Sequence, residues 1–395
     1  MRPRKLVPVA AGLTLLLAAA ACTSSGSDTT DNSAPAPKAS GAALSLKGTC
    51  PDTVVIQTDW FTESEYGGIY QLLGPNYTVD TKKKLLTGPL VASGQDTGVK
   101  VEIRTGGPAI GYQTVSAQMY ADKSITLGQV NTDESIQNSK SQPTTAVVAP
   151  LEISPLMILW GTQAHPGFNT IADIGQTDTK ILYYQTDTYM QYLRGAGLVR
   201  SSQLDGSYDG TPGRFVQSDG EIANAGFATS EPYIFKNQLP KGQPGYDTHL
   251  QLINDTGYPM YGEALAIRAG DKDKLAPCLQ KLVPIIQQSS VDFITNPAAT
   301  NKLVIGAVET IHDFWTYSPG MADYAVNTLK SLGLVSNGPD KTLGNIQDSR
   351  IQRMIGILTP IYATQHKQIK DGLKPSDLYT NEYINPAIGL STSAK

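Results

Sequence analysis

Residues 53–58 read Thr-Val-Val-Ile-Gln-Thr, and the polar and aromatic segment Asp-Trp-Phe-Thr-Glu-Ser-Glu-Tyr follows directly at residues 59–66. An unbroken run of apolar and β-branched residues is typical of a buried strand, and a helix is predicted at residues 66–73. Strand, polar loop and helix in this order form the repeating unit of an open α/β sheet. In such sheets ligands bind beyond the carboxyl ends of the strands, so the loop at residues 59–66 is the first candidate for a binding site.

The same alternation continues toward the middle of the chain. The predicted elements are strands at residues 99–104 and 125–130 and helices at residues 111–120 and 133–139. Two apolar runs, at residues 145–150 and 156–160, are then separated by Pro150 and Pro155. We interpret this break as the point where the chain crosses into a second lobe.

A second α/β unit follows, and the chain then returns. The predicted elements are strands at residues 180–184 and 213–216, helices at residues 188–196 and 221–225, a return crossing at residues 251–253 and 263–268, and helices at residues 275–294, 322–332 and 350–370. The sequence thus predicts an α/β fold with two lobes. Lobe 1 would comprise residues 49–152 and 262–395, and lobe 2 would comprise residues 153–261.

The amino terminus carries an apolar run at residues 6–21, preceded by basic residues and followed by Cys22. At 16 residues the run is shorter than the roughly 20 that span a membrane. Small residues before a cysteine are typical of lipoprotein processing, so residues 1–21 are predicted to be a signal peptide and Cys22 to be lipidated. An ordinary signal or an uncleaved anchor remains the alternative, because Ala19 stands where such signals usually have leucine. Residues 22–48, rich in Ser, Thr, Pro and Gly, are predicted to be a flexible tether.

Charge and cysteine content narrow the possible partners. The formal net charge is −4 and no long basic stripe is present, which argues against nucleic acid. The lysine run at residues 82–84 is predicted to be a solvated helix face. Outside the membrane, where thiols oxidise, Cys50 and Cys278 are predicted to form a disulfide, with two separate thiols as the alternative.

Motifs for catalysis and for cofactors are missing from the sequence. The four histidines show no metal-ligand spacing, and neither a Gly-x-Ser-x-Gly elbow nor a phosphate-binding Gly-x-x-x-x-Gly-Lys-Thr loop occurs. The glycine-rich segment at residues 106–111 is better explained as backbone amides at a helix start, which makes Gly107 a candidate ligand contact. The sequence therefore predicts no cofactor, no metal and no enzyme activity.

The loop after the first predicted strand contains the strongest candidates for ligand binding. Trp60 can stack on a planar ligand, and Glu63 and Glu65 can accept hydrogen bonds from its N–H groups; packing and solvation are the alternative roles. Asp59-Trp60 followed by Gly68-Ile69-Tyr70 resembles the opening motif Asp-Trp-x-Pro-Asn-x-x-His-x-Gly-x-Tyr of the thiamine-pyrimidine branch of solute-binding proteins. Glu231-Pro232-Tyr233 resembles a segment of the same superfamily, which also includes sulfonate, taurine and nitrate binders.

The resemblance implies a type II periplasmic-binding-protein fold with mixed, mainly parallel sheets, a two-strand hinge and a ligand in the cleft. Against the motif, Thr62 replaces proline, Glu63 and Glu65 replace the two asparagines, and Tyr66 replaces histidine. Carboxylates at these positions favour a ligand rich in donors, or a cation, and disfavour a sulfonate or nitrate.

Other candidate ligand contacts follow later predicted strands. They are Asn131, Thr186, Asp187, Glu231 and Tyr233. Helix capping is the alternative for Asp187, and a purely structural role is the alternative for Glu231 and Tyr233.

The expected function is solute capture for an ATP-driven (ABC) importer. The protein would be a monomer anchored by lipid on the extracytoplasmic face of the cell membrane, with a permease and its cytoplasmic ATPase as partners. A sulfonate or nitrate binder and a ligand-sensing receptor domain remain alternatives. A pyrimidine-synthase-like enzyme is disfavoured, because such relatives carry a cysteine-rich iron motif that Cys50 and Cys278 alone cannot supply.

Overall fold

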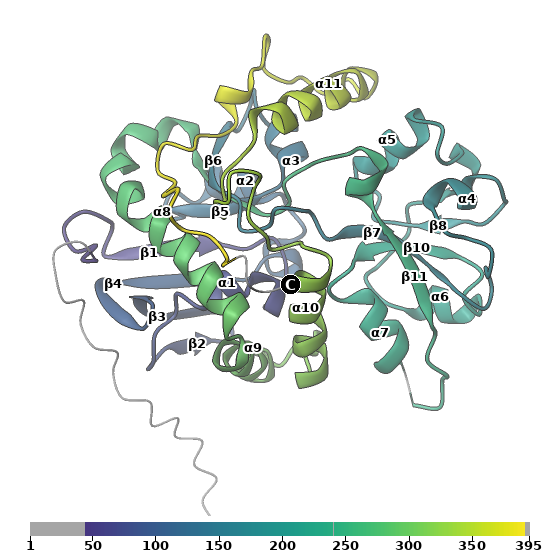
Figure 1. Ribbon diagram of the computed structural model, residues 1–395, viewed down its shortest axis with the longest axis horizontal. Helices are drawn as coiled ribbons and strands as arrows, with labels where there is room; N and C mark the ends of the chain where they lie inside the picture. Colours follow the sequence, from purple (N-terminus) through teal and green to yellow (C-terminus); the bar gives the residue numbers. More distant parts are fainter. Residues whose placement is uncertain (1–43, 240, 392–395) are drawn as a thin grey trace, which may run out of the picture. The chain divides into compact units, whose positions relative to one another are not determined.

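The computed structural model describes residues 44–239 and 241–391. The signal peptide, Cys22 and residues 22–43 of the predicted tether lie outside these residues. Two β-sheets organise the described chain (Figure 1). The first sheet has seven strands in the order β2-β3-β4-β1-β5-β12-β6, and the second has five in the order β11-β7-β10-β8-β9. The part built on each sheet is called the first or the second lobe below.

The strands are β1 (Thr53–Gln57), β2 (Thr78–Asp80), β3 (Leu85–Ala92), β4 (Gln95–Arg104), β5 (Leu127–Val130), β6 (Thr144–Val148), β7 (Leu156–Gly161), β8 (Ile181–Leu182), β9 (Leu204–Asp205), β10 (Ala223–Phe227), β11 (Thr248–Leu252) and β12 (Ala264–Arg268). The helices are α1 (Gly67–Tyr70), α2 (Val115–Ala121), α3 (Thr132–Gln137), α4 (Ile171–Gly175), α5 (Tyr189–Gly195), α6 (Gly213–Gln217), α7 (Glu231–Asn237), α8 (Lys272–Thr295), α9 (Ala298–Ile311), α10 (Pro319–Ser331) and α11 (Asp348–Thr364).

Both sheets mix parallel and antiparallel pairs. In the first sheet β1 is parallel to β4 and β5, while β12 is antiparallel to β5 and β6. In the second sheet β8 is parallel to β9 and β10, while β7 is antiparallel to β10 and β11. The predicted α/β architecture with two mixed sheets is confirmed, but the expectation of mainly parallel sheets is wrong, because six of the ten strand pairs that the structure describes are antiparallel.

The chain passes between the sheets twice. The first crossing lies between Val148, the last residue of β6, and Leu156, the first of β7; the second lies between Leu252 of β11 and Ala264 of β12. The predicted lobe limits, after residues 152 and 261, fall within these two segments and stay predictions.

Helix α8 packs against the first sheet together with α1, as Figure 1 shows. Its buried face includes Leu279, Leu282 and Ile286, which join Val54 and Ile56 of β1 in one apolar cluster. Burial of apolar surface of this kind supplies most of the favourable free energy of folding. Cys278 in the same helix is bonded to Cys50, so the predicted disulfide is confirmed.

Helix α11 contacts both lobes. It packs against α3 in the first lobe and α5 in the second. Met354 and Leu358 of α11 share one apolar cluster with Ile136 of α3 and with Met190 and Leu193 of α5. The helix therefore bridges the two lobes.

Three local predictions are wrong. Residues 82–84 form a turn between β2 and β3, not a helix face, because the carboxylate of Asp80 accepts hydrogen bonds from the backbone N–H groups of Lys82 and Lys83. Residues 213–216 begin helix α6 instead of a strand, and the predicted helix at residues 221–225 largely forms β10. Strand β10 is placed between β7 and β8, and pairing in the sheet there overrides local helix propensity.

Within residues 44–239 and 241–391, no helix combines the length and the apolar character needed to cross a membrane.

Candidate functional site

A cavity of about 700 Å³, called the interlobe cavity below, is lined by loops of both lobes. The first lobe contributes Asn131, directly after β5, and Glu134 in α3. The second lobe contributes residues 184–189 after β8, and Phe227 at the end of β10. Met260 lines it from the second crossing. The cavity therefore lies at the carboxyl ends of strands from both sheets, where this kind of fold binds ligands.

Three residues predicted from the sequence line the interlobe cavity: Asn131, Thr186 and Asp187. The Oδ1 atom of Asn131 accepts a hydrogen bond from the backbone N–H of Glu263 at 2.8 Å. The Oδ2 atom of Asp187 accepts one from the Tyr189 hydroxyl at 2.9 Å. The N-cap of α5 is Thr188, so Asp187 does not cap that helix.

Carboxyl groups of both lobes face the interlobe cavity. Burial raises the pKa of Glu134 and of Asp187 to about 7, and the charge of Asp133 contributes to both increases. Burial also raises the pKa of Asp133. Lys367, which is exposed, is the one lysine or arginine among the lining residues that the structure describes.

Trp60 lies beside the interlobe cavity. Its ring centroid is 6.0 Å from that of Tyr184, which lines the cavity, and 6.1 Å from that of Tyr112. Gly107 packs directly against the indole, since a Cβ atom at this position would lie 2.9 Å from a carbon of the ring. Gly107 thus leaves room for the Trp60 side chain.

Four acidic side chains, called the inner carboxyl cluster below, are buried or half-buried beside the second crossing: Asp59, Glu63, Glu65 and Glu263. The Thr229 hydroxyl, from the loop after β10, donates a hydrogen bond to Glu65, so this glutamate contacts the opposite lobe. The buried carboxyl groups of Glu65 and Glu263 are hydrogen-bonded to each other, which requires one of the two to be protonated. The hydroxyl of Tyr66 donates to Oδ1 of Asp59 at 2.8 Å, and the ligand contact predicted for Tyr66 stays a prediction.

Burial is the main cause of the altered titration of the inner carboxyl cluster. It raises the pKa of Asp59 to about 6 and that of Glu65 to about 7. It raises the pKa of Glu63 and Glu263 well above the ordinary range, and the neighbouring carboxylates add to that increase. Burial of charge without a cationic partner favours the protonated form.

Glu231 and Tyr233 are not among the residues that line the interlobe cavity. Oε2 of Glu231 accepts hydrogen bonds from the Phe227 backbone N–H at 2.7 Å and from the Ser230 hydroxyl at 2.8 Å. The ring of Tyr233 packs against that of Tyr324 in α10. These contacts favour the structural alternative for both residues, and their role in ligand binding stays a prediction.

Sequence reasoning missed four residues of this region: Glu134, Tyr184, Glu263 and Lys367. Glu134 and Tyr184 were assigned to a helix and to a strand, without a binding role. Glu263 stands immediately before the apolar run of β12. A single charged residue at the edge of a buried strand is the sequence feature that could have identified it. No local signal marked Lys367, because its position depends on the packing of α11.

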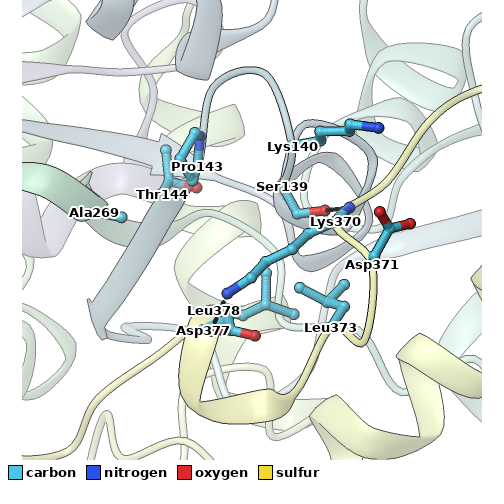
Figure 2. A pocket seen from close by; sticks show the side chains of 10 residues that line it. All are labelled: Ser139, Lys140, Pro143, Thr144, Ala269, Lys370, Asp371, Leu373, Asp377 and Leu378. Carbon is cyan, nitrogen blue, oxygen red and sulfur yellow. Dashed lines mark hydrogen bonds and ion pairs between the residues drawn. The ribbon is translucent and has the colours of Figure 1, made fainter.

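A second cavity, of about 520 Å³, is shown in Figure 2. It is lined by Ser139 and by Thr144, the first residue of β6, and thus lies at the opposite end of the first sheet from Asn131. The Lys370 side chain extends along it to form an ion pair with Asp377 (Figure 2). None of the residues predicted from the sequence lines this cavity.

No group of three or more His, Cys, Asp or Glu side chains in the described part of the chain is arranged to hold a metal ion.

Two mixed sheets, two crossing segments and a cavity at the strand ends of both lobes define the class: the chain has the periplasmic-binding-protein fold. No protein-family model and no curated protein sequence matches it.

Solved structures show the likeness directly. The aliphatic sulphonate binding protein SsuA of Escherichia coli is 13% identical with a TM-score of 0.52, over 82% of this chain and 94% of that one. A zinc-bound ligand-binding component of an ABC-type import system from Staphylococcus aureus is 12% identical with a TM-score of 0.53, and the match covers 85% of this chain and 100% of that one. The alkanesulfonate-binding protein SsuA of Xanthomonas axonopodis, bound to MOPS, is 11% identical with a TM-score of 0.52, over 84% and 99%. At these identities the likeness establishes the fold.

Proposed function

We propose that this protein is the extracytoplasmic solute-binding subunit of an ABC importer, and that it captures a small, planar, nitrogen-containing solute of the thiamine-precursor type. The observation that carries the proposal is the interlobe cavity, because Asn131 of the first lobe and Asp187 of the second line the same space. A solute that contacts both lobes stabilises their closed arrangement over the open one.

The mechanism is capture and delivery without chemistry. The Trp60 indole supplies an aromatic surface next to Tyr184 at the edge of the cavity. The closed form would then dock on a permease with a cytoplasmic ATPase. A lipid on Cys22 would keep the protein, as a monomer, at the extracytoplasmic face of the membrane.

A thermal-shift screen of the purified protein tests this function. The compounds are thiamine precursors, other nitrogen heterocycles, amines, sulfonates and nitrate. At least one compound is expected to raise the Tm through binding to the native state. Trp60→Ala is expected to weaken that binding by about tenfold, while Trp60→Phe retains a ring and loses less. Absence of any stabilising compound would contradict the proposed function.

A further inference from the structure

The charges around the interlobe cavity indicate the chemical class of the solute. We propose that the solute is an organic cation whose charged nitrogen is bound by Glu134 of the first lobe and Asp187 of the second. The inference rests on the proposed function and specifies the substrate of that same site.

The acidic groups that line the cavity form no ion pairs in the described chain, although the charge of Lys367 opposes the increase in the pKa of Asp133. Asp133, Glu134 and Asp187 line it, and none of them forms an ion pair with a lysine or arginine in the described chain. Their observed contacts are to neutral donors, such as the Ser116 backbone N–H on Glu134 at 2.8 Å. Lys367, the one basic lining residue described, donates to the amide oxygen of Gln137. The lining therefore has an excess of negative charge when its carboxyl groups are ionised.

The inner carboxyl cluster lies behind the wall of the interlobe cavity and also consists of acidic groups without a basic partner among the described residues. Glu65 is 5% exposed and Glu263 is 3% exposed, and their carboxyl groups are hydrogen-bonded to each other. Glu263 lies directly behind the cavity wall, since its backbone N–H binds Asn131, which lines the cavity. No lysine or arginine forms an ion pair with these carboxyl groups in the described chain, so this region disfavours further negative charge. A cation in the adjoining cavity is therefore favoured over an anion.

The aromatic lining fits the same class of solute. Tyr184, Tyr189 and Phe227 line the cavity, and Tyr184 also packs against Trp60 and Tyr208. Aromatic faces attract organic cations, most strongly when water is excluded. A sulfonate or nitrate would instead be repelled by the lining carboxylates. Lys367 is the one basic residue among the described lining residues that would offset this repulsion.

The charge of the solute can be tested before its identity is known. A neutral aqueous metabolite extract is separated on a cation-exchange resin into retained and unretained fractions, and each is added to the full-length protein in a thermal-shift titration. The retained fraction is expected to raise the Tm. Asp187→Asn and Glu134→Gln should each require about ten times more of that fraction for the same shift, since each removes one charge-assisted hydrogen bond.

Asp178→Asn is the matched control, because the Asp178 carboxylate is on the surface and pairs with Arg200. This variant is expected to respond as the wild type does. Stabilisation by the unretained fraction alone, or equal responses from Asp187→Asn and Asp178→Asn, would overturn the cation proposal and leave solute binding standing. Stabilisation by neither fraction would contradict the proposed function itself.

Discussion

Gly107 positions the Trp60 ring. Its φ is +55°, a region that side chains disfavour, and a Cβ atom would contact the indole. Gly107→Ala is therefore expected to cost roughly 1–2 kcal/mol from backbone strain, together with displacement of Trp60. Urea unfolding and tryptophan fluorescence measure the two effects.

Gly111→Ala is the control for Gly107→Ala. Gly111 has a similar φ of +63°, but a Cβ atom there would meet open space. Gly111→Ala should therefore lower the free energy of unfolding without changing the tryptophan fluorescence of the folded protein. Identical fluorescence spectra for both variants would contradict the assigned contact.

The carboxyl groups at the interlobe cavity predict a pH dependence. The pKa of Glu134 and of Asp187 is about 7 in the folded protein and near 4 when unfolded. Between these values the folded state binds more protons, so the free energy of unfolding decreases as the pH rises from 5 to 8. The Tm of the ligand-free protein should fall over this range, by roughly 2–4 °C for each kcal/mol lost.

Asp187→Asn should make this decrease in Tm shallower, because the amide does not ionise. Asp178→Asn, on the surface, should keep the wild-type slope. A Tm that rises between pH 5 and 8, or an unchanged slope in Asp187→Asn, would show that Asp187 does not titrate in this way.

At the residue level, a polar residue directly after a predicted strand was a good indicator of a residue that lines the interlobe cavity. Asn131 and Asp187 were predicted as ligand contacts because they follow predicted strands, and both line the interlobe cavity. Glu263 was not predicted as a functional residue, because its proximity to Glu65 depends on how the return crossing packs. Such contacts between distant segments leave no local signal.

Among the structural elements, helix α11 stabilises both crossing segments through Arg350. The guanidinium donates to the Glu152 backbone oxygen at 2.8 Å and carboxylate at 2.9 Å in the first crossing. It also donates to the Pro259 carbonyl at 3.2 Å in the second and lies 3.7 Å from the Tyr261 ring centroid. One side chain thus ties the two segments together.

Arg350→Lys is expected to reduce the free energy of unfolding by about 1–3 kcal/mol, since an ammonium group cannot reproduce the planar set of donors. The control is Arg353→Lys in the same helix, where the exposed arginine donates to the Gly257 carbonyl at 3.1 Å. That change should cost less than about 0.5 kcal/mol. Equal losses in urea unfolding would refute the special role of Arg350.

Helices and strands were predicted well from the sequence where the apolar pattern was long, and poorly where that pattern was short. Helix α8 and strand β1 followed from extended apolar patterns. Residues 213–227 were misassigned because Phe215 and Val216 form only a brief apolar pair, and because sheet pairing, not propensity, places β10. The hairpin of β2 and β3 was missed, since Gly88 and Pro89 interrupt its strand pattern.

For the whole molecule, capture of a solute between the lobes would require them to move relative to each other. The Glu65 to Thr229 hydrogen bond crosses between them, and the interlobe cavity is lined by both. Opening must break this contact while α11 keeps the crossing segments together. The two-lobed plan followed from the strand pattern, but the bridging position of α11 did not, because it arises from packing against both α3 and α5.

Hydrogen–deuterium exchange with and without the stabilising solute distinguishes a solute held between the lobes from one bound to a single lobe. Slower exchange is expected in residues 131–137 of the first lobe and residues 184–191 of the second, with residues 78–92 unchanged as the internal control. Protection in both lobes would show that the solute is held between them. Protection confined to one lobe, or absent from both segments while the Tm still rises, would contradict capture in the interlobe cavity.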